Sequence, residues 1–181
     1  MTEQITTKEK GVSLSLEGIV REAKRIEENC LYTSKSHFAA SYVWEKCNLC
    51  IGIPTVILAA IAGTLAFTNL PKLSIASGIL AIVVAILTGI ATFLNPKEKA
   101  NNHFTSGNNY DSLLSKVRIF WTIDCRRENS EEVLTDQLKY FSEQRDRLNR
   151  DCPQPPRWAY KKAKKGIEEG EANYFVDKDT K

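Results

Sequence analysis

The sequence predicts an all-α protein in which a two-helix transmembrane hairpin joins long cytosolic helices that form a helical bundle. The main observation is a sharp sorting of charge. The 181-residue chain has 25 Lys and Arg and 22 Asp and Glu, yet only Lys72 lies between Cys47 and Asn95. A soluble domain of ordinary composition mixes its charged and apolar residues more evenly. The flanking segments show apolar residues at helical spacing, and no segment shows convincing strand alternation.

Residues 1–46 are expected to form a cytosolic helix that runs into the first membrane crossing. Its apolar seam alternates steps of three and four residues: Leu16, Ile19, Ala23, Ile26, Cys30, Thr33, His37, Ala40 and Trp44. The seam weakens at Thr33 and His37, which favours a bundle or an oligomer contact over a two-stranded coiled coil. His37 on this seam is either a packing residue or a pH switch.

Residues 47–95 are expected to form the hairpin, with crossings at 47–70 and 73–94. Each crossing contains a run of 22 residues without a charge. Such a helix reaches about 33 Å, and the hydrocarbon core of a bilayer is about 30 Å thick. Pro71 suits a tight turn between the crossings. The alternative is a buried hairpin in a soluble protein.

The lysines near the hairpin predict its orientation. No signal peptide is visible, so the hairpin is expected to stay in the chain with both flanks on one side of the membrane. Lys35, Lys46, Lys97 and Lys99 lie near the outer ends of the crossings, whereas Lys72 is alone in the turn. The positive-inside rule therefore predicts a multi-pass protein with both termini in the cytoplasm.

Residues 96–181 are expected to form further cytosolic helices and a frayed basic tail. Asn95 is the predicted cap of a helix that begins at Pro96, with Glu98 reaching back to the cap. One face of this helix then carries His103, Gly107, Tyr110, Leu114, Val117 and Trp121. A second cap, at Asn129 with Glu132, is predicted to precede a stripe of Leu134, Leu138, Phe141, Arg145 and Leu148 that ends before Pro153.

The last helical segment is strongly basic. Its positive charges are Arg157, Lys161, Lys162, Lys164 and Lys165, and Trp158 and Tyr160 lie among them. Such a segment either lies on an anionic bilayer surface or forms a solvated terminal helix.

Small and hydroxylated residues form a stripe on each crossing. In the second crossing the stripe is Ser74, Gly78, Ala81, Ala85, Gly89 and Thr92, and in the first it is Gly52, Thr55, Ala59, Gly63 and Ala66. Small residues let helices approach closely in lipid. The stripes either only hold the hairpin together or line a pore in an oligomer. In a pore, hydroxyls would come from Ser74, Ser77, Thr88 and Thr92.

The sequence predicts no enzyme, and no cofactor or metal site. Phosphate-binding, dinucleotide-binding and metalloprotease motifs are missing from it. The five cysteines are scattered; the CxxC pair Cys47 and Cys50 is either a packing feature or half of a metal or redox site. The crossings contain no acidic residue, which disfavours a proton-driven carrier. The nearly balanced charge of the flanks predicts no nucleic-acid partner.

Several short motifs follow one another in a distinctive order. They are His37 and Trp44 before the first crossing, Leu49 to Pro54 at its start, Asn95-Pro96, Ala100 to His103 followed by Tyr110, Leu113 and Leu114, and Cys152 to Tyr160. This layout resembles the SMODS and SLOG-associating two-transmembrane effector family, the SLATT family, as one domain over about residues 13–167. His37, Trp44, His103, Tyr110 and Leu114 are its expected packing positions.

The resemblance implies an inner-membrane effector of a bacterial nucleotide-signalling or other anti-phage conflict system. Such an effector is expected to oligomerise in lipid and form pores that permeabilise or depolarise the membrane, which arrests the infected cell by abortive infection. The implied partners are membrane lipid, further copies of the chain and an upstream sensor or nucleotide-messenger protein. The alternative is a non-conducting, membrane-anchored helical module for interaction or scaffolding.

Overall fold

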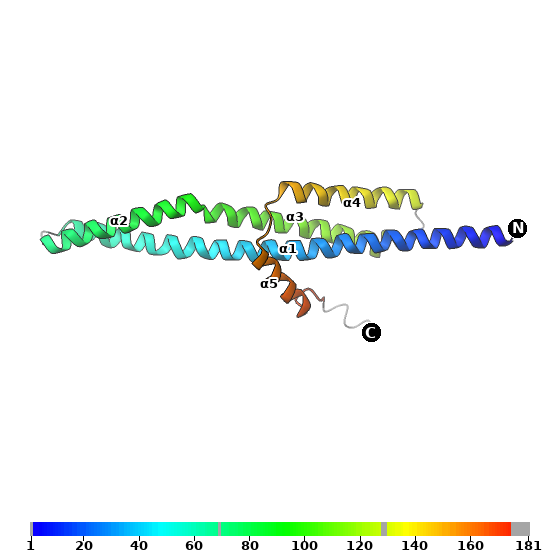
Figure 1. Ribbon diagram of the computed structural model, residues 1–181, viewed down its shortest axis with the longest axis horizontal. Helices are drawn as coiled ribbons and strands as arrows, with labels where there is room; N and C mark the ends of the chain where they lie inside the picture. Colours follow the sequence, from blue (N-terminus) through cyan, green and yellow to red (C-terminus); the bar gives the residue numbers. More distant parts are fainter. Residues whose placement is uncertain (1, 69, 128–129, 175–181) are drawn as a thin grey trace. The chain divides into compact units, whose positions relative to one another are not determined.

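The computed structural model describes residues 2–68, 70–127 and 130–174, and these residues confirm the all-α prediction. Its elements are α1 (Thr2–Ala66), α2 (Pro71–Leu94), α3 (Pro96–Thr122), the short 3₁₀ helix η1 (Asp124–Arg126), α4 (Glu131–Asp151) and α5 (Arg157–Glu168) (Figure 1). No strand occurs in the described parts of the chain. The end of the expected tail, residues 175–181, lies outside them.

The chain divides into two compact units. The hairpin unit is Ser41–Asn102, and the bundle unit combines Met1–Ala40 with His103–Lys181. Helix α1 continues from the bundle unit into the hairpin unit without a break, and α3 starts in the hairpin unit and continues into the bundle unit.

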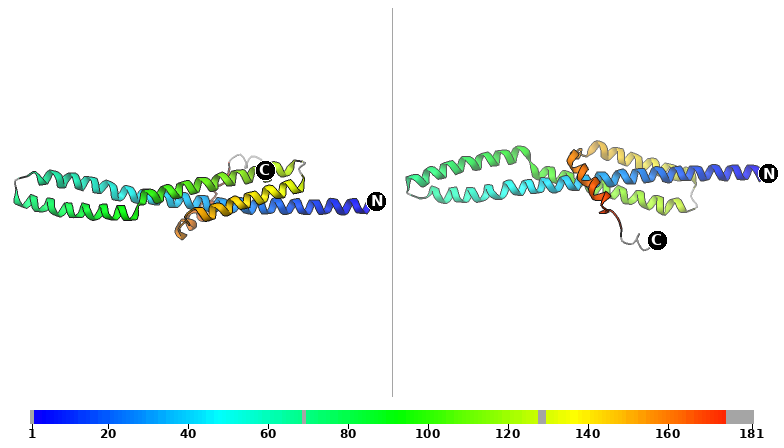
Figure 2. Two further views of the ribbon diagram at one scale, coloured as in Figure 1. Left: turned by 90° about the horizontal axis from the view of Figure 1, so that it is seen from above. Right: turned by 60° about the horizontal axis from the view of Figure 1, so that its bottom comes forward.

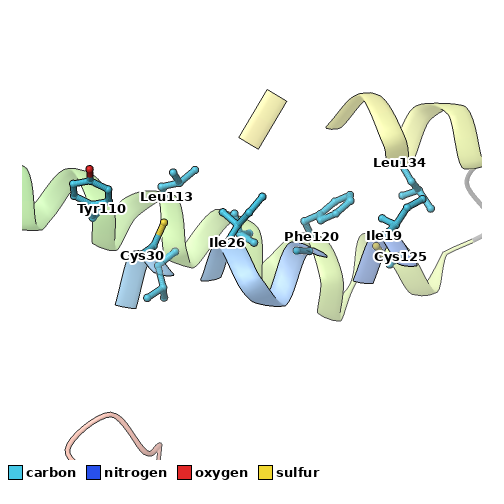
Figure 3. Packing of buried hydrophobic residues seen from close by; sticks show 11 residues of the cluster. Ile19, Ile26, Cys30, Tyr110, Leu113, Phe120, Cys125 and Leu134 are labelled. Atoms are coloured by element: carbon cyan, nitrogen blue, oxygen red, sulfur yellow. The ribbon is translucent and has the colours of Figure 1, made fainter. Parts of the chain in front are cut away.

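The core of the bundle unit forms where α1, α3 and α4 pack together, as Figure 3 shows. Its buried members are Ile19, Ala23, Ile26, Cys30, Tyr110, Leu113, Leu114, Val117, Phe120, Cys125 and Leu134. Half-buried Leu138, Phe141 and Leu148 of α4 pack against this cluster. Each of the three helices therefore places apolar residues of its predicted stripe in a shared core, whereas Trp44 of the predicted α1 seam lies outside this core in the hairpin unit.

Asn95 joins α2 to α3, and its predicted role as a cap is confirmed. Its φ of 43° is left-handed, and its backbone N–H donates to the Ala91 carbonyl at 2.9 Å, which closes α2. Its side-chain oxygen accepts the backbone N–H of Glu98 at 3.4 Å, at the start of α3. Asn is one of the few residues that adopt left-handed backbone readily. Pro96 follows as the first residue of α3.

Two predicted boundaries differ from the structure. Helix α4 is capped by Ser130, whose hydroxyl accepts the Val133 N–H at 3.4 Å, because a Ser oxygen suits the free N–H groups of a first turn. The predicted cap, Asn129, lies outside the described residues. Pro71 is the first residue of α2 rather than part of the turn. The N–H group of a first helical residue has no partner within the helix, so proline costs no hydrogen bond at this position.

The fold predicts that truncating Phe120 destabilises the bundle strongly. Phe120 is 1% exposed and its ring centre lies 5.4 Å from that of Phe141. Phe120→Ala removes a filled core volume and should cost about 3–5 kcal/mol of unfolding free energy. The matched control is Ile119→Ala, since Ile119 is the preceding residue on α3 and is 51% exposed. Unfolding of detergent-solubilised protein, followed by circular dichroism, measures both; equal losses would contradict the described core.

Candidate functional site

Helices α1 and α2 run side by side in the hairpin (Figure 1). The face through which they pack contains Ala62 and Ser77. Ala62 on α1 is 7% exposed and Ser77 on α2 is 8% exposed. The Ser77 hydroxyl donates a hydrogen bond of 2.8 Å to the Ala62 carbonyl oxygen. Two small residues at one level let the backbones approach, and the hydroxyl links them. Ser77 therefore belongs to the interior of the hairpin.

The small-residue stripe of α2 lies on a different face, which the hairpin leaves exposed. Its members Ser74, Gly78, Ala81, Ala85, Gly89 and Thr92 are all exposed. A Cβ atom added at Gly78 or Gly89 would meet no atom within 4 Å, and the same is true at Gly52 and Gly63 on α1. These four glycines therefore do not set the distance between the two helices of one hairpin. Their faces are available to lipid or to another chain.

The exposed hydroxyls of Thr88 and Thr92 donate to carbonyl groups of their own helix. Thr88 donates to the Val84 carbonyl at 2.8 Å, and Thr92 donates to the Thr88 carbonyl at 2.9 Å. Each hydroxyl proton thus has a partner even in contact with lipid, where an unpaired donor is costly. Each oxygen still has lone pairs that can accept a hydrogen bond from water.

Both helices of the hairpin are long and apolar enough to cross a membrane. The most apolar 18-residue segments of these helices have mean hydropathies of 2.2 and 2.5, and 6% of each segment is buried. A core helix of a soluble protein is mostly buried, so this exposure disfavours a buried soluble hairpin. The apolar surface that the described chain leaves open instead suits a bilayer.

A second cluster lies in the bundle unit, where His37 of α1 meets His103 of α3. Their Nδ1 atoms are 2.9 Å apart, and the side chains are buried, with residue exposures of 1% and 6%. The His37 ring stacks on Tyr110, with ring centres 5.7 Å apart and planes inclined by 18°. The Tyr110 hydroxyl in turn donates to Asn149 of α4 at 2.8 Å. Three predicted packing positions therefore meet in one polar cluster that links three helices.

The other two predicted packing positions lie elsewhere. Leu114 is in the hydrophobic core of the bundle unit. Trp44 is half-buried in the hairpin unit, where the Lys99 ammonium lies 4.5 Å from its ring centre.

Gly107 provides the close approach of α1 and α3 next to the two histidines. A Cβ atom at Gly107 would lie only 2.7 Å from the Phe38 ring, closer than real Cβ contacts come. Glycine at this position removes that clash and lets the Phe38 ring cover the α3 backbone.

Burial shifts the ionisation of this region. It lowers the pKa of His37 to about 4, with a further contribution from His103, and it also lowers the pKa of His103. Both imidazoles are therefore neutral near pH 7. Burial raises the pKa of Tyr110 and of the nearby Cys30 thiol to about 12, so both keep their protons.

Helix α5 lies across α1, as Figure 2 shows, and it docks through a small face that the sequence analysis did not identify. This face is Ala159, Ala163 and Gly166, all buried and spaced by four and three residues. The Tyr160 and Tyr32 rings lie beside it with centres 6.1 Å apart. The spacing of these three residues indicates one face of a helix, but the sequence analysis considered only the cationic face formed by the neighbouring lysines.

The outer face of α5 carries the five predicted surface cations. Arg157, Lys161, Lys162, Lys164 and Lys165 are all exposed. Grooves of about 450 and 460 Å³ run along its contact with α1, and Lys162, Lys164 and Lys165 line them. Glu168 and Glu169 lie 3.7 and 3.6 Å from Lys164 and Lys165, so these two charges are partly balanced.

Cys30 and Cys152 act on Tyr110 of the polar cluster, whereas Cys47 and Cys50 lie in the hairpin unit. All five cysteines are free, and Cys47 and Cys50 lie one helical turn apart on α1, half-buried and exposed. Among the residues whose positions are described, no three His, Cys, Asp or Glu side chains gather in a way that could hold a metal ion.

A family model described as SMODS and SLOG-associating 2TM effector domain family 4 matches residues 16–179. No curated protein matches the chain. No solved structure matches it either.

The docking of α5 leads to a prediction for Ala159, which is 0% exposed. Ala159→Leu overfills the contact with α1, at a cost of about 1–3 kcal/mol. Trypsin should then cleave α5 roughly tenfold faster, because about 1.4 kcal/mol is a tenfold change in equilibrium. Lys161→Leu is the control on the exposed face, where four cleavable cations remain in Arg157–Lys165. Unchanged cleavage of the Ala159 variant would mean that α5 is not docked.

Proposed function

The chain belongs to family 4 of the SMODS and SLOG-associating 2TM effector domains, and from this membership we propose that it forms an oligomeric pore in the bacterial inner membrane. The family is one of membrane effectors in conflict systems. The pore would permeabilise or depolarise the membrane of an infected cell and so arrest that cell.

The exposed stripe of α2 carries this proposal. It extends from Ser74 to Thr92, all its members are exposed, a Cβ atom at Gly78 or Gly89 would meet no atom within 4 Å, and it includes the hydroxyls of Ser74 and Thr92. Thr88 adds a third exposed hydroxyl beside it. A helix that only anchors a protein in lipid has no need of a continuous face of small and hydroxylated residues.

A pore requires several copies of the hairpin, because two helices cannot enclose a path for water. Gly78, Ala85 and Gly89 would let α2 of one copy approach a helix of the next. The hydroxyls of Ser74, Thr88 and Thr92 would line the gap. We leave Ser77 out of the proposed lining, since its hydroxyl already bonds to Ala62 inside the hairpin. Gly52 and Gly63 would serve contacts of α1.

The proposed topology places both termini in the cytoplasm. It is supported by Lys35, Lys46, Lys97 and Lys99 near the outer ends of the hairpin, against Lys72 near its turn. The bundle unit is then on the side where an upstream sensor or a nucleotide-messenger protein could reach it. The role that we propose uses no catalytic residue and no cofactor.

A second candidate function is a membrane-anchored interaction module that does not conduct. The cationic outer face of α5 offers a surface for an acidic partner. Exchanging residues 47–95 for an unrelated two-helix anchor separates the two functions. If the chain forms a pore, the protein with the foreign anchor should no longer arrest the infected cell. Full arrest of the cell by this protein would favour the scaffold.

The proposed pore leads to the prediction that a large side chain on the stripe of α2 blocks depolarisation of the membrane. Gly89→Leu should reduce it at least tenfold in triggered cells, because the larger side chain keeps neighbouring hairpins apart. It should leave the hairpin itself intact, since a Cβ at Gly89 meets no atom within 4 Å. Ile86→Phe is the matched control, because Ile86 is 57% exposed but lies off the stripe. A potential-sensitive dye measures both variants; full depolarisation by Gly89→Leu would refute the proposed lining.

A further inference from the structure

The two histidines of the chain contact each other although 66 positions separate them. They also lie where the chain passes from one unit to the other. Ala40 is the last residue of the bundle unit on α1, three residues after His37, and His103 is its first residue on α3. The contact therefore ties together the two helices that connect the bundle unit to the hairpin unit.

The 2.9 Å separation fixes how the neutral pair shares its protons. A neutral imidazole has one N–H and one lone pair, so one ring must donate its Nδ1–H and the other must accept at Nδ1. The accepting ring then carries its own proton on Nε2. The pair thus consists of two different tautomers, and each defines the other.

The groups around the pair offer little to balance a charge. On α3 the ionisable neighbour of His37 is Tyr110, whose ring stacks on it and whose hydroxyl donates to Asn149 of α4, and Cys30 of α1 acts on Tyr110 in turn. Arg145 of α4 and Cys152 act on Tyr110 as well. From α5, Lys162 shares a groove with Phe38, the residue after His37. Neither histidine forms an ion pair with a carboxylate among the pairs found in the described residues.

Protonation affects this contact in two different steps. The first proton goes to the free Nε2 of the donor ring, which leaves the Nδ1–H···Nδ1 bond in place and makes it charge-assisted. The second proton must go to the Nδ1 that accepts this bond. Two N–H groups and two positive charges then face each other in a buried site, so the contact must open.

We propose that His37 and His103 form a proton-operated latch, which holds α1 and α3 together while at most one ring is charged and releases them when both are. The ligand of this latch is the proton itself. Its release loosens the two helices where they enter the hairpin, so acid favours rearrangement of the hairpin. The link from that rearrangement to conduction rests on the proposed function, whereas the latch itself does not.

The pH range of release follows from the shifted ionisation. In the open state His37 has its ordinary pKa of 6.5, and in the closed state its pKa is lowered to about 4. Because His37 is harder to protonate in the closed state, it stabilises that state fully above pH 6.5. This stabilisation of the closed state falls as the pH drops toward 4. Between pH 7.5 and pH 4.5 the ratio of closed to open forms should fall on the order of 100-fold.

Hydrogen exchange on the full chain in lipid nanodiscs tests the latch at pH 7.5 and pH 4.5. The wild type is compared with a His37→Gln, His103→Gln double variant, whose amides can bond to each other without titrating. At each pH the intrinsic exchange rates of the two proteins differ only at the two substituted positions and their immediate neighbours, and the comparison uses the other amides of each segment. At pH 4.5 the segments 31–40 and 100–110 should exchange at least tenfold faster in the wild type than in the variant. The core segment 113–120 should stay equally protected in both.

Two results would overturn the proposal. One is equal exchange of wild type and double variant in both segments at pH 4.5, provided that the variant has wild-type helix content at pH 7.5. The other comes from nitrogen NMR of the wild type with labelled histidine, which does not depend on any variant. We expect both rings to titrate below pH 6.5 in two separate steps. Two independent titrations near pH 6.5 would refute the latch. Neither readout requires conduction, so a failed pore and a failed latch are distinguishable.

Discussion

The structure depends on one constraint: the apolar side chains of the hairpin must be covered by something other than their own chain. Within the hairpin, each helix uses one narrow face for its partner, and the close contact there is made by Ala62 and Ser77. The remaining faces stay open, with 6% of each apolar segment buried. A bilayer supplies this cover without demanding specific contacts, since lipid tails accept any apolar surface.

Charge is arranged to agree with this constraint. The ionisable groups lie on the bundle unit and at the ends of the hairpin, and the hydroxyls of Thr88 and Thr92 bond to their own helix. The bundle unit has the opposite character, with a core of three helices and exposed ion pairs such as Arg21 with Glu17. Its buried polar side chains have hydrogen-bond partners, as the contacts of His37 with His103 and of Ser36 with the Tyr32 carbonyl show.

Sequence reasoning found the helices and their inward faces because periodicity reports burial directly. The seam from Ile19 to Ala40 and the Asn95 cap are examples, since each depends on residues close together in the chain. It did not find the contact between His37 and His103. Spacing shows that each histidine faces a core, but the sliding of one helix along another decides which residues meet. The docking face of α5 was missed for a related reason: Ala and Gly carry little hydrophobic signal.

The double role of Asn95 has a mechanical consequence. Helix α2 ends and α3 begins at this one residue, so no flexible spacer separates them. A helix advances about 100° per residue, which means that the chain at this joint fixes the rotational phase of the α2 stripe relative to the first turn of α3. Rotation of α3 about its own axis therefore also rotates α2, because no flexible segment between them can take up the motion.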